Sequence, residues 1–449
     1  MKLPLNHQLK AFLDKTPISF HVPGHKNMTI GDLKQIGLDM DITEITDFDD
    51  LHHPEEVLKE SMQQLTKHPD YEAYYLVNGT TSGILSVIQA AAQSSDSILM
   101  SRNVHKSVFH GLDLSTQAAQ IMPMEMSKQT KHYRAPDISE AENTMTDHSL
   151  AIVTYPNYYG ETFDVQRFIQ SSHKHHIPVL IDEAHGAHFG LEGFPVSSLE
   201  YQADYVVQSY HKTLPAFTMS SVIFIHKDAP YQAQVKQYLT YFQSSSPSYL
   251  LMAGLERAQA FYQNYNSTLF FKKRKVLMTD LRSRGFLVGE MDDPLKLTLK
   301  YPGHSGYEVQ TWLEEQDIYV ELADDYQTLL VLPLWHEDDT FPFELLQERI
   351  KQIVLPEMPS SNYIDQENLL PTEMGHYQPL HLKSTIEVEL QKAVGKRLGQ
   401  HLVPYPPGIP VYFKGEEVTD NVVQNVESWI AQGIRVEGLK DNKIRIEDN

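Results

Sequence analysis

The sequence predicts an α/β fold in which helices cover a mostly parallel sheet. From about Tyr74 to Phe224, short apolar segments alternate with segments of helical spacing, and this alternation is typical of parallel strands joined by crossover helices. The expected strands are residues 73–77, 97–100, 150–154, 179–181, 205–207 and 221–225, and residues 84–91 have helical spacing. Polar side chains follow several of these strands, at the edge where such sheets bind ligands.

Length and changes of pattern predict three domains, since 449 residues exceed one ordinary domain. We expect an N-terminal segment and large domain over residues 1–271, a small α/β domain over 272–360, and a C-terminal α+β domain over 361–449. The small domain should contain strands at 295–299, 318–322 and 328–332. A linker is expected at 356–362, a helix around 386–398, and a proline-rich extended turn at 403–410.

The composition narrows the classes of partner. The formal charge of −22, from 37 basic and 59 acidic residues, argues against a nucleic-acid partner, which needs a basic face. This charge either attracts a cationic small molecule or simply keeps the protein soluble. The absence of cysteine excludes disulfides and a thiol nucleophile. We find no apolar segment long enough to span a bilayer and no signal peptide, so the expected location is the cytoplasm, with no membrane partner.

Two strand ends point to pyridoxal phosphate (PLP) chemistry. One apolar strand ends at Asp182, and a second ends in a Ser-Tyr-His-Lys sequence that closes at Lys212. A lysine can form a Schiff base with the aldehyde, and an ionised aspartate can keep the ring nitrogen protonated. Ser209 and His211 can reach the phosphate. Partial burial and a nearby cationic ring would lower the pKa of Lys212.

Two upstream motifs support this interpretation. Residues 78–83, Asn-Gly-Thr-Thr-Ser-Gly, join a strand to a helix, where hydroxyls and free amides form a phosphate cradle. The alternative role of the same residues is a helix N-cap. His105 follows the next strand and can stack on the pyridine ring; taken alone, it is also compatible with an ordinary surface histidine.

A metal site is the rival interpretation of the same region. His185 and His188 lie three residues apart, a spacing that metal sites use, next to Asp182 and Glu183. No further ligand cluster with suitable spacing accompanies them, so we expect no metal.

Together these motifs resemble the Orn/Lys/Arg decarboxylases, which are PLP enzymes of fold type I related to the aspartate aminotransferases. The resemblance covers nearly the whole chain. The length of the chain is similar to that of the short bacterial members, which lack an N-terminal wing domain. The Pro-Gly-His-Lys and Tyr-Pro-Pro-Gly-Ile-Pro sequences are its most specific parts. The matching segments are Phe20–Lys26, Asp41–Leu51, Leu76–Thr81, Arg102–Ser107, Tyr155–Gly160, Ile181–His188, Ser209–Ala216, Ser244–Tyr249 and Pro404–Pro410.

The resemblance implies decarboxylation of lysine, arginine or ornithine, as in polyamine biosynthesis. The substrate amine would displace Lys212, carbon dioxide would leave, and Lys212 or His211 would return a proton to Cα. By the same resemblance Ser245 and its neighbours reach the phosphate of a partner subunit, so we expect a homodimer with shared sites. His25 and residues 406–408 are secondary candidates. The implied catalytic residues are Lys212, His211, Asp182 and His105, and the implied cofactor-binding residues are Lys212, Thr80, Thr81, His105, Asp182, His185, Ser209, His211 and Ser245.

Departures from the family pattern leave alternatives open. Tyr210 replaces the usual threonine beside Lys212, Asn27 replaces a glycine, and Gln400 stands where an acidic residue is expected. A lost carboxylate at Gln400 would weaken recognition of a distal cation. The alternatives are a PLP-binding protein without turnover, or another PLP reaction such as that of an aldolase or aminotransferase.

Overall fold

The computed structural model describes residues 3–92, 97–356, 370–379, 385–405, 410–431 and 433–448. Within these ranges we find no helix whose length and hydropathy suit a bilayer-spanning segment.

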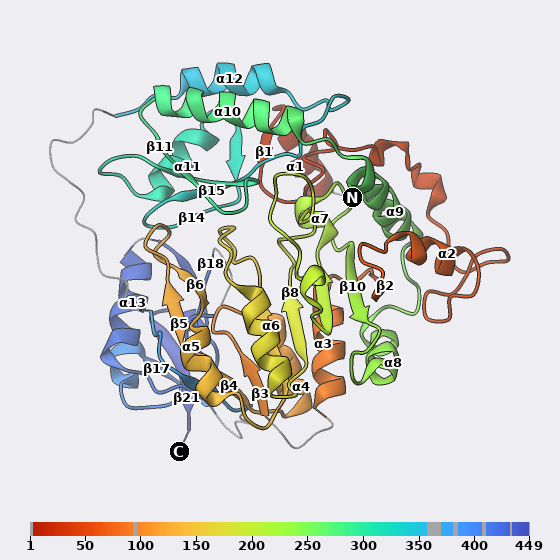
Figure 1. The fold of residues 1–449 in the computed structure, drawn as a ribbon. Coiled ribbons are helices and arrows are strands. Elements are labelled where there is room, and N and C mark those ends of the chain that lie inside the picture. The colour runs from red at the N-terminus through yellow and green to blue at the C-terminus, as the bar shows by residue number, and fades with distance from the viewer. Residues whose placement is uncertain are drawn as a thin grey trace.

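An eight-stranded sheet forms the centre of the molecule (Figure 1). Its strands pair in parallel from β4 through β3, β7 and β8 to β9, whereas β10, β2 and the edge strand β16 are antiparallel to their neighbours. The predicted parallel sheet is therefore confirmed in its middle, and the structure adds antiparallel edges. In spatial order the strands are β16 (Gly375–Tyr377), β4 (Ala119–Ile121), β3 (Ser97–Met100), β7 (His148–Thr154), β8 (Val179–Asp182), β9 (Tyr205–Gln208), β10 (Ser221–His226) and β2 (Tyr71–Leu76).

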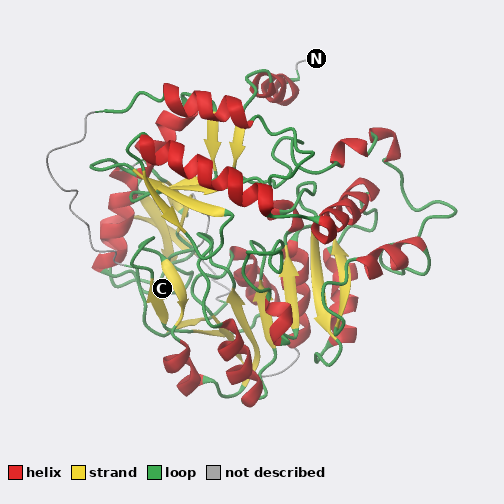
Figure 2. Cartoon of the chain, turned by 45° about the horizontal axis from the view of Figure 1, so that its top comes forward, coloured by secondary structure: helices red, strands yellow, loops and turns green. Residues whose placement is uncertain are grey.

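Helices cover both faces of this sheet (Figure 2). Successive strand residues point to opposite faces, and in β8 Leu180 packs in one core cluster while Val179 and Ile181 pack in the other. The middle strands are mostly apolar, as expected of strands whose two faces are both buried. The cluster around Leu180 includes α3 (Thr80–Ala91), α4 (Lys106–Ser115) and α8 (Gln232–Phe242), and the other includes α6 (Val165–Lys174) and α9 (Tyr249–Asn264).

A four-stranded antiparallel sheet forms a second layer beyond the carboxyl ends of the central strands. Figure 1 shows α10 (Thr268–Ser283) and α12 (Phe343–Gln352) side by side above it. A short strand near the N-terminus, β1 (Ile18–Phe20), pairs in parallel with β13 (Ile318–Val320). The strands of the four-stranded sheet are, in spatial order, β11 (Leu287–Glu290), β12 (Lys296–Lys300), β15 (Thr328–Val331) and β14 (Leu322–Ala323). Helix α11 (Gly306–Glu314) packs against this sheet.

The last part of the chain has its own small core and is tied to the central sheet. Arg102 Nη1 and Nη2 both lie 3.1 Å from Glu416 Oε1, and Lys414 pairs with Asp113 at 2.8 Å. The elements of this last part of the chain are β17 (Thr385–Glu389), β18 (Val403–Tyr405), α13 (Asp420–Ala431), β19 (Arg435–Glu437), β20 (Leu439–Lys440) and β21 (Lys443–Glu447).

The predicted helix around 386–398 is wrong. Residues 385–389 form β17, which pairs with β21, and a 3-10 turn η5 (Leu390–Ala393) follows. The proline-rich turn is β18 at its start, and residues 406–409 lie outside the described part of the chain, as do residues 357–362 of the expected linker. The domain boundaries stay a prediction.

The remaining elements connect or flank these layers. They are α1 (Pro4–Leu13), η1 (Leu33–Gln35), η2 (Leu38–Met40), α2 (Val57–Gln64), β5 (Met124–Met126), β6 (Tyr133–Pro136), α5 (Ile138–Ala141), η3 (Glu142–Thr144), η4 (Ser198–Tyr201) and α7 (Tyr210–Thr213).

Candidate active site

The parallel strands of the central sheet end at one cavity of about 470 Å³. Five of the predicted site residues line it: Thr80, His105, Asp182, His185 and Lys212. Asp182 ends β8, and the other four come from the segments after β2, β3, β8 and β9, so these side chains gather at strand ends as expected.

Lys212 lies on the short helix α7, which begins directly after β9. Its Nζ is 3.2 Å from His185 Nε2. Burial lowers the pKa of Lys212, whereas the charges of Asp182 and Glu321 oppose that shift. A lysine placed this way yields its neutral, nucleophilic form more readily than a surface lysine does.

Asp182 is the last residue of β8 and is 3% exposed. Its Oδ1 accepts a hydrogen bond from the backbone N–H of Ala184 at 3.2 Å. Burial raises the pKa of this carboxyl, while the positive charge of Lys212 opposes that effect. A cationic group in the cavity would therefore hold Asp182 in its ionised form.

His105 is the N-cap of α4, and the imidazole itself makes the cap. Its Nδ1 accepts from the backbone N–H of Ser107 at 3.2 Å, so the proton of the neutral ring lies on Nε2. Burial, together with the charge of Lys212, lowers the pKa of His105 to about 3. The ring is therefore neutral, as stacking on a cationic heterocycle requires.

The phosphate cradle predicted at residues 78–83 has the expected backbone. Gly79 is the N-cap of α3, with φ of +77°, and no side chain caps the helix. Its positive φ favours glycine. The hydroxyls of Thr80 and Ser209 lie 3.2 Å apart. The N-terminus of α3 thus presents backbone donors next to two hydroxyls, which suits an anion. The same residues also make the N-cap, which is Gly79 and has no side-chain hydrogen bond.

The other predicted residues are not among those that line this cavity. Thr81 is in the first turn of α3, and His211 Nδ1 bonds to Ser220 O at 3.0 Å. Ser245 is exposed, in a loop whose Ser244 N–H donates to Asn78 Oδ1 at 3.2 Å. The segment containing His25 packs on α7, where Gly24 N–H donates to the His211 carbonyl at 2.7 Å. Residues 406–408 lie outside the described residues.

The residues of the rival metal interpretation have other partners. His188 Nε2 is 2.9 Å from Asp293 Oδ1, and Glu183 accepts from Ser197, Ser198 and Gln208. Across the described ranges, we find no group of three or more His, Cys, Asp or Glu side chains that could hold a metal ion.

Comparison with known proteins agrees with the geometry. The family model described as the Orn/Lys/Arg decarboxylase major domain matches residues 3–282. The chain belongs to the Orn/Lys/Arg decarboxylase family.

Relatives along the whole chain include proteins named as decarboxylases. The protein YaaO of Bacillus subtilis is 37% identical over 98% of this chain and 96% of its own length. An arginine decarboxylase of the same organism is 26% identical over 99% of this chain and 96% of its own length. The inducible lysine decarboxylase of Escherichia coli is 23% identical over 93% of this chain and 75% of its own length.

The solved structures agree on the fold. The lysine decarboxylase LdcF of Francisella novicida has a TM-score of 0.69 at 20% identity and covers 92% of this chain and 76% of its own. Cysteine desulfurase of Thermococcus onnurineus matches at a TM-score of 0.53 and 12% identity, over 78% of this chain and 99% of its own. These matches, with the mixed central sheet, show the fold type I architecture of PLP enzymes.

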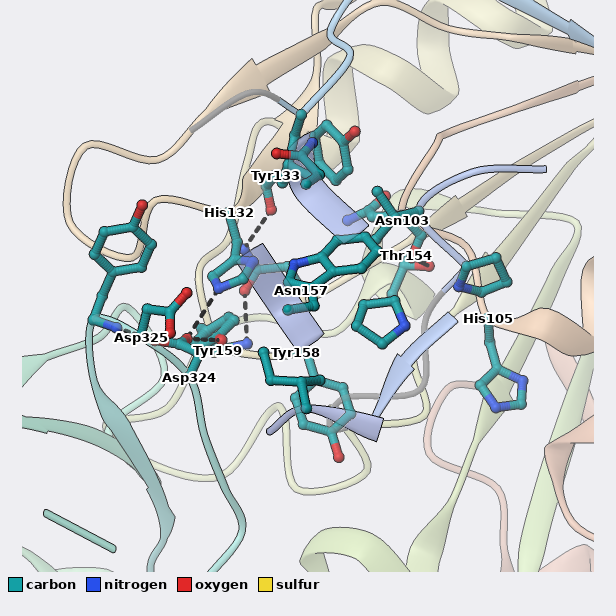
Figure 3. Close-up of a pocket in the computed structure, with 18 of the residues that line it drawn as sticks. Asn103, His105, His132, Tyr133, Thr154, Asn157, Tyr158, Tyr159, Asp324 and Asp325 are labelled. Atoms are coloured by element: carbon teal, nitrogen blue, oxygen red, sulfur yellow. Dashed lines mark hydrogen bonds and ion pairs between the residues drawn. The ribbon is translucent and has the colours of Figure 1, made fainter. Parts of the chain in front are cut away.

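Sequence reasoning missed the acidic side of the cavity. Asp324 and Asp325 lie in the turn between β14 and β15, on the side of the pocket away from His105 (Figure 3). Asp324 accepts from Tyr159 OH and Gln327 N–H and pairs with His132 Nε2 at 2.9 Å. Helix α13 also lines the cavity, with Gln424, Asn425, Ser428 and Trp429. Apart from Tyr159, no motif marks these residues, because four separate segments of the chain bring them together.

Two of the three departures from the family pattern, Tyr210 and Gln400, lie away from the cavity. Tyr210 is fully buried, its hydroxyl donates to Gln259 Oε1 at 2.9 Å, and Lys67 Nζ lies 4.6 Å from its ring centre. Gln400 Nε2 donates to Gly438 O at 2.7 Å. Neither side chain is among those that line the cavity.

This placement predicts that Gln400→Glu leaves substrate preference unchanged. The carboxylate cannot donate to Gly438 O, so the variant should lose about 1–3 kcal/mol of unfolding free energy. Denaturant unfolding together with kcat/KM for arginine, lysine and ornithine measures both effects. A change in substrate preference at unchanged stability would contradict the placement of Gln400.

Proposed function

We propose that this protein is a PLP-dependent decarboxylase that converts lysine, arginine or ornithine to the corresponding amine and carbon dioxide. The observation that carries the proposal is the arrangement around one cavity of the Lys212 amine, the Asp182 carboxylate, the His105 ring and the hydroxyl-lined N-terminus of α3. Membership of a family whose relatives are named arginine and lysine decarboxylases supports the same reaction.

The donor set fits the proposed cofactor group by group. Lys212 would hold its aldehyde carbon, Asp182 its ring nitrogen and His105 its ring face, with His185 alongside. Thr80, Thr81, Ser209 and His211 would surround the phosphate, which the positive end of the α3 dipole attracts. When bound, the cofactor supplies an electron sink for the bond that breaks. Lys212 and His211 are the proposed proton donors to Cα.

The two aspartates on one side of the cavity, Asp324 and Asp325, are consistent with a substrate that carries a positive charge. The carboxylate of Asp324 is held by several hydrogen bonds, and its pairing with His132 and Tyr159 lowers its pKa against the effect of burial. These contacts fix the turn that carries Asp325, which also lines the cavity. We infer that Asp325 receives the distal cation of the substrate, a role that the sequence had suggested for position 400.

Asp325→Asn should raise KM for the preferred basic amino acid. A hydrogen bond to a charged group contributes about 1.5–3 kcal/mol, so the expected rise is roughly 10- to 150-fold. The change in kcat should be smaller. Steady-state kinetics measures it, with the exposed Asp338, which does not line the cavity, replaced by Asn as the matched control. Equal effects of the two variants would contradict the assignment.

The proposal extends to assembly and location. We propose a cytoplasmic homodimer in which Ser245 reaches the phosphate of the partner's site, and its exposure on a loop leaves it available for such a contact. The proposed domains remain residues 1–271, 272–360 and 361–449. The expected role in the cell is polyamine biosynthesis, with a small-molecule substrate and neither nucleic-acid nor membrane partners.

Incubation with PLP and a mixture of the twenty common amino acids tests the reaction without presuming the substrate. Mass spectrometry of the products should detect cadaverine, agmatine or putrescine and no other new amine. Formation of 2-oxo acids would instead indicate an aminotransferase, and carbon–carbon cleavage to an aldehyde would indicate an aldolase. Bound PLP with no product would favour the alternative of a protein that retains the site without turnover.

A further inference from the structure

A second lysine, Lys296, contacts the site from the opposite side of His185. Lys296 is the first residue of β12 in the four-stranded sheet and is fully buried. Its Nζ lies 3.3 Å from His185 Nδ1 and 3.2 Å from the Tyr158 carbonyl oxygen. Because Lys212 Nζ is 3.2 Å from His185 Nε2, one imidazole bridges two lysines that are 84 residues apart in the sequence.

The number of hydrogen-bond donors and acceptors on the imidazole limits how many of the two lysines can be protonated. Burial, with Lys212 and Lys296 on either side, lowers the pKa of His185 well below its ordinary value, so the ring is neutral. A neutral imidazole has one N–H donor and one acceptor nitrogen, whereas an ammonium group can only donate. Two ammonium groups therefore cannot both hydrogen-bond to it. If both contacts form, one lysine is the neutral amine that accepts the ring N–H.

We propose that Lys296 is a positioning residue for Lys212: with His185 between them, the two lysines carry one positive charge, and a protonated Lys296 leaves Lys212 as a free amine. The proton can pass without a net change of charge. Lys212 gives a proton to His185 Nε2, while the proton on Nδ1 moves to Lys296, and the reverse transfer restores it. The use of this amine in catalysis rests on the proposed function; the sharing of charge does not.

The surroundings of both lysines support this exchange. Burial and the charge of Lys212 lower the pKa of Lys296 to about 8, against the effects of Asp293 and Glu321. The charge of Glu321 raises the pKa of both lysines, so it favours protonation without selecting one lysine over the other. The ionisable groups that act on the three residues are Asp182, Asp293 and Glu321, together with Lys26, His105 and His211.

The test is the pH dependence of acetylation of Lys212 in the full-length protein without PLP. Trace labelling with acetic anhydride follows the neutral fraction of an amine, and peptide mass spectrometry resolves Lys212 from the other lysines. The midpoint of the profile reports the protonation equilibrium, while its plateau reports access. Since the experiment uses no cofactor or substrate, its result is independent of whether the protein decarboxylates an amino acid.

Lys296→Met should raise the Lys212 midpoint by about one pH unit or more, because it removes a like charge and the partner in proton exchange. Well below the midpoint, labelling should fall about tenfold. Lys296→Arg keeps the charge, so its midpoint should stay at or below that of the unmodified protein. Lys300→Met, on the same strand, is the matched control and should change nothing.

An unchanged or lower midpoint in Lys296→Met would overturn the proposal, as would a rise in Lys296→Arg equal to that in Lys296→Met. Circular dichroism checks that each variant is folded. If Lys296→Met does not fold, Lys296→Gln removes the charge with a polar side chain, and the same rise is expected.

Discussion

Lys212→Ala should abolish the covalent link between PLP and the protein and reduce decarboxylation by at least about 10²–10⁴-fold, the range that one positioned proton-transfer group contributes. Lys212 lines the cavity, and among the described residues its Nζ has one hydrogen-bond partner, His185. Its replacement therefore removes the nucleophile with little loss of packing. Borohydride reduction followed by peptide mass spectrometry detects the link at this residue.

Lys67 provides a matched control for this experiment. It is a second lysine whose pKa burial lowers, to about 7, but its Nζ donates to Ala187 O and Gln208 Oε1 and lies outside the cavity lining. Lys67→Ala should affect stability while PLP is still trapped at Lys212. A PLP adduct on any other lysine of the unmodified protein would refute the assignment.

Asp182→Asn should leave PLP bound but reduce turnover. The amide keeps the size of the side chain and loses the charge that would hold the cofactor ring nitrogen protonated. Loss of a hydrogen bond between charged groups costs about 1.5–3 kcal/mol, which corresponds to a fall in kcat of roughly 10- to 150-fold. Steady-state kinetics at saturating PLP measures the effect, and absorbance titration measures cofactor affinity.

Thr80→Ala provides the contrasting result. Thr80 bonds to Ser209 at the N-terminus of α3, so its loss should weaken PLP binding and change kcat much less once the site is saturated. Near-normal turnover in Asp182→Asn would contradict its role as the partner of the ring nitrogen.

The sequence was a good guide wherever one local segment determines the geometry. Asp182 and Lys212 each end or follow an apolar strand, and parallel strands bring such ends to one edge. It failed at residues 386–398, where Glu, Leu, Gln and Lys favour helix. The alternation of Ile386 and Val388 with charged residues was the signal for a strand, and the partner of that strand, β21, lies more than fifty residues further on.

The parts that escaped prediction depend on contacts between distant segments. Lys296 and Asp325 come from the four-stranded sheet and its turns, and α13 comes from the end of the chain. Nothing local distinguishes these side chains from ordinary surface or core residues. Conversely, Tyr210 and Gln400 attracted attention because of their positions in motifs, yet the fold directs both away from the cavity.

The most direct test of the proposed reaction is carbon dioxide release from carboxyl-labelled lysine, arginine and ornithine by the purified protein with added PLP. Labelled carbon dioxide should be released from at least one of the three, with an equal amount of the matching amine, and Lys212→Ala should release it at least about 10²-fold more slowly. Absence of release from all three, by folded protein with PLP bound at Lys212, would contradict the proposed function.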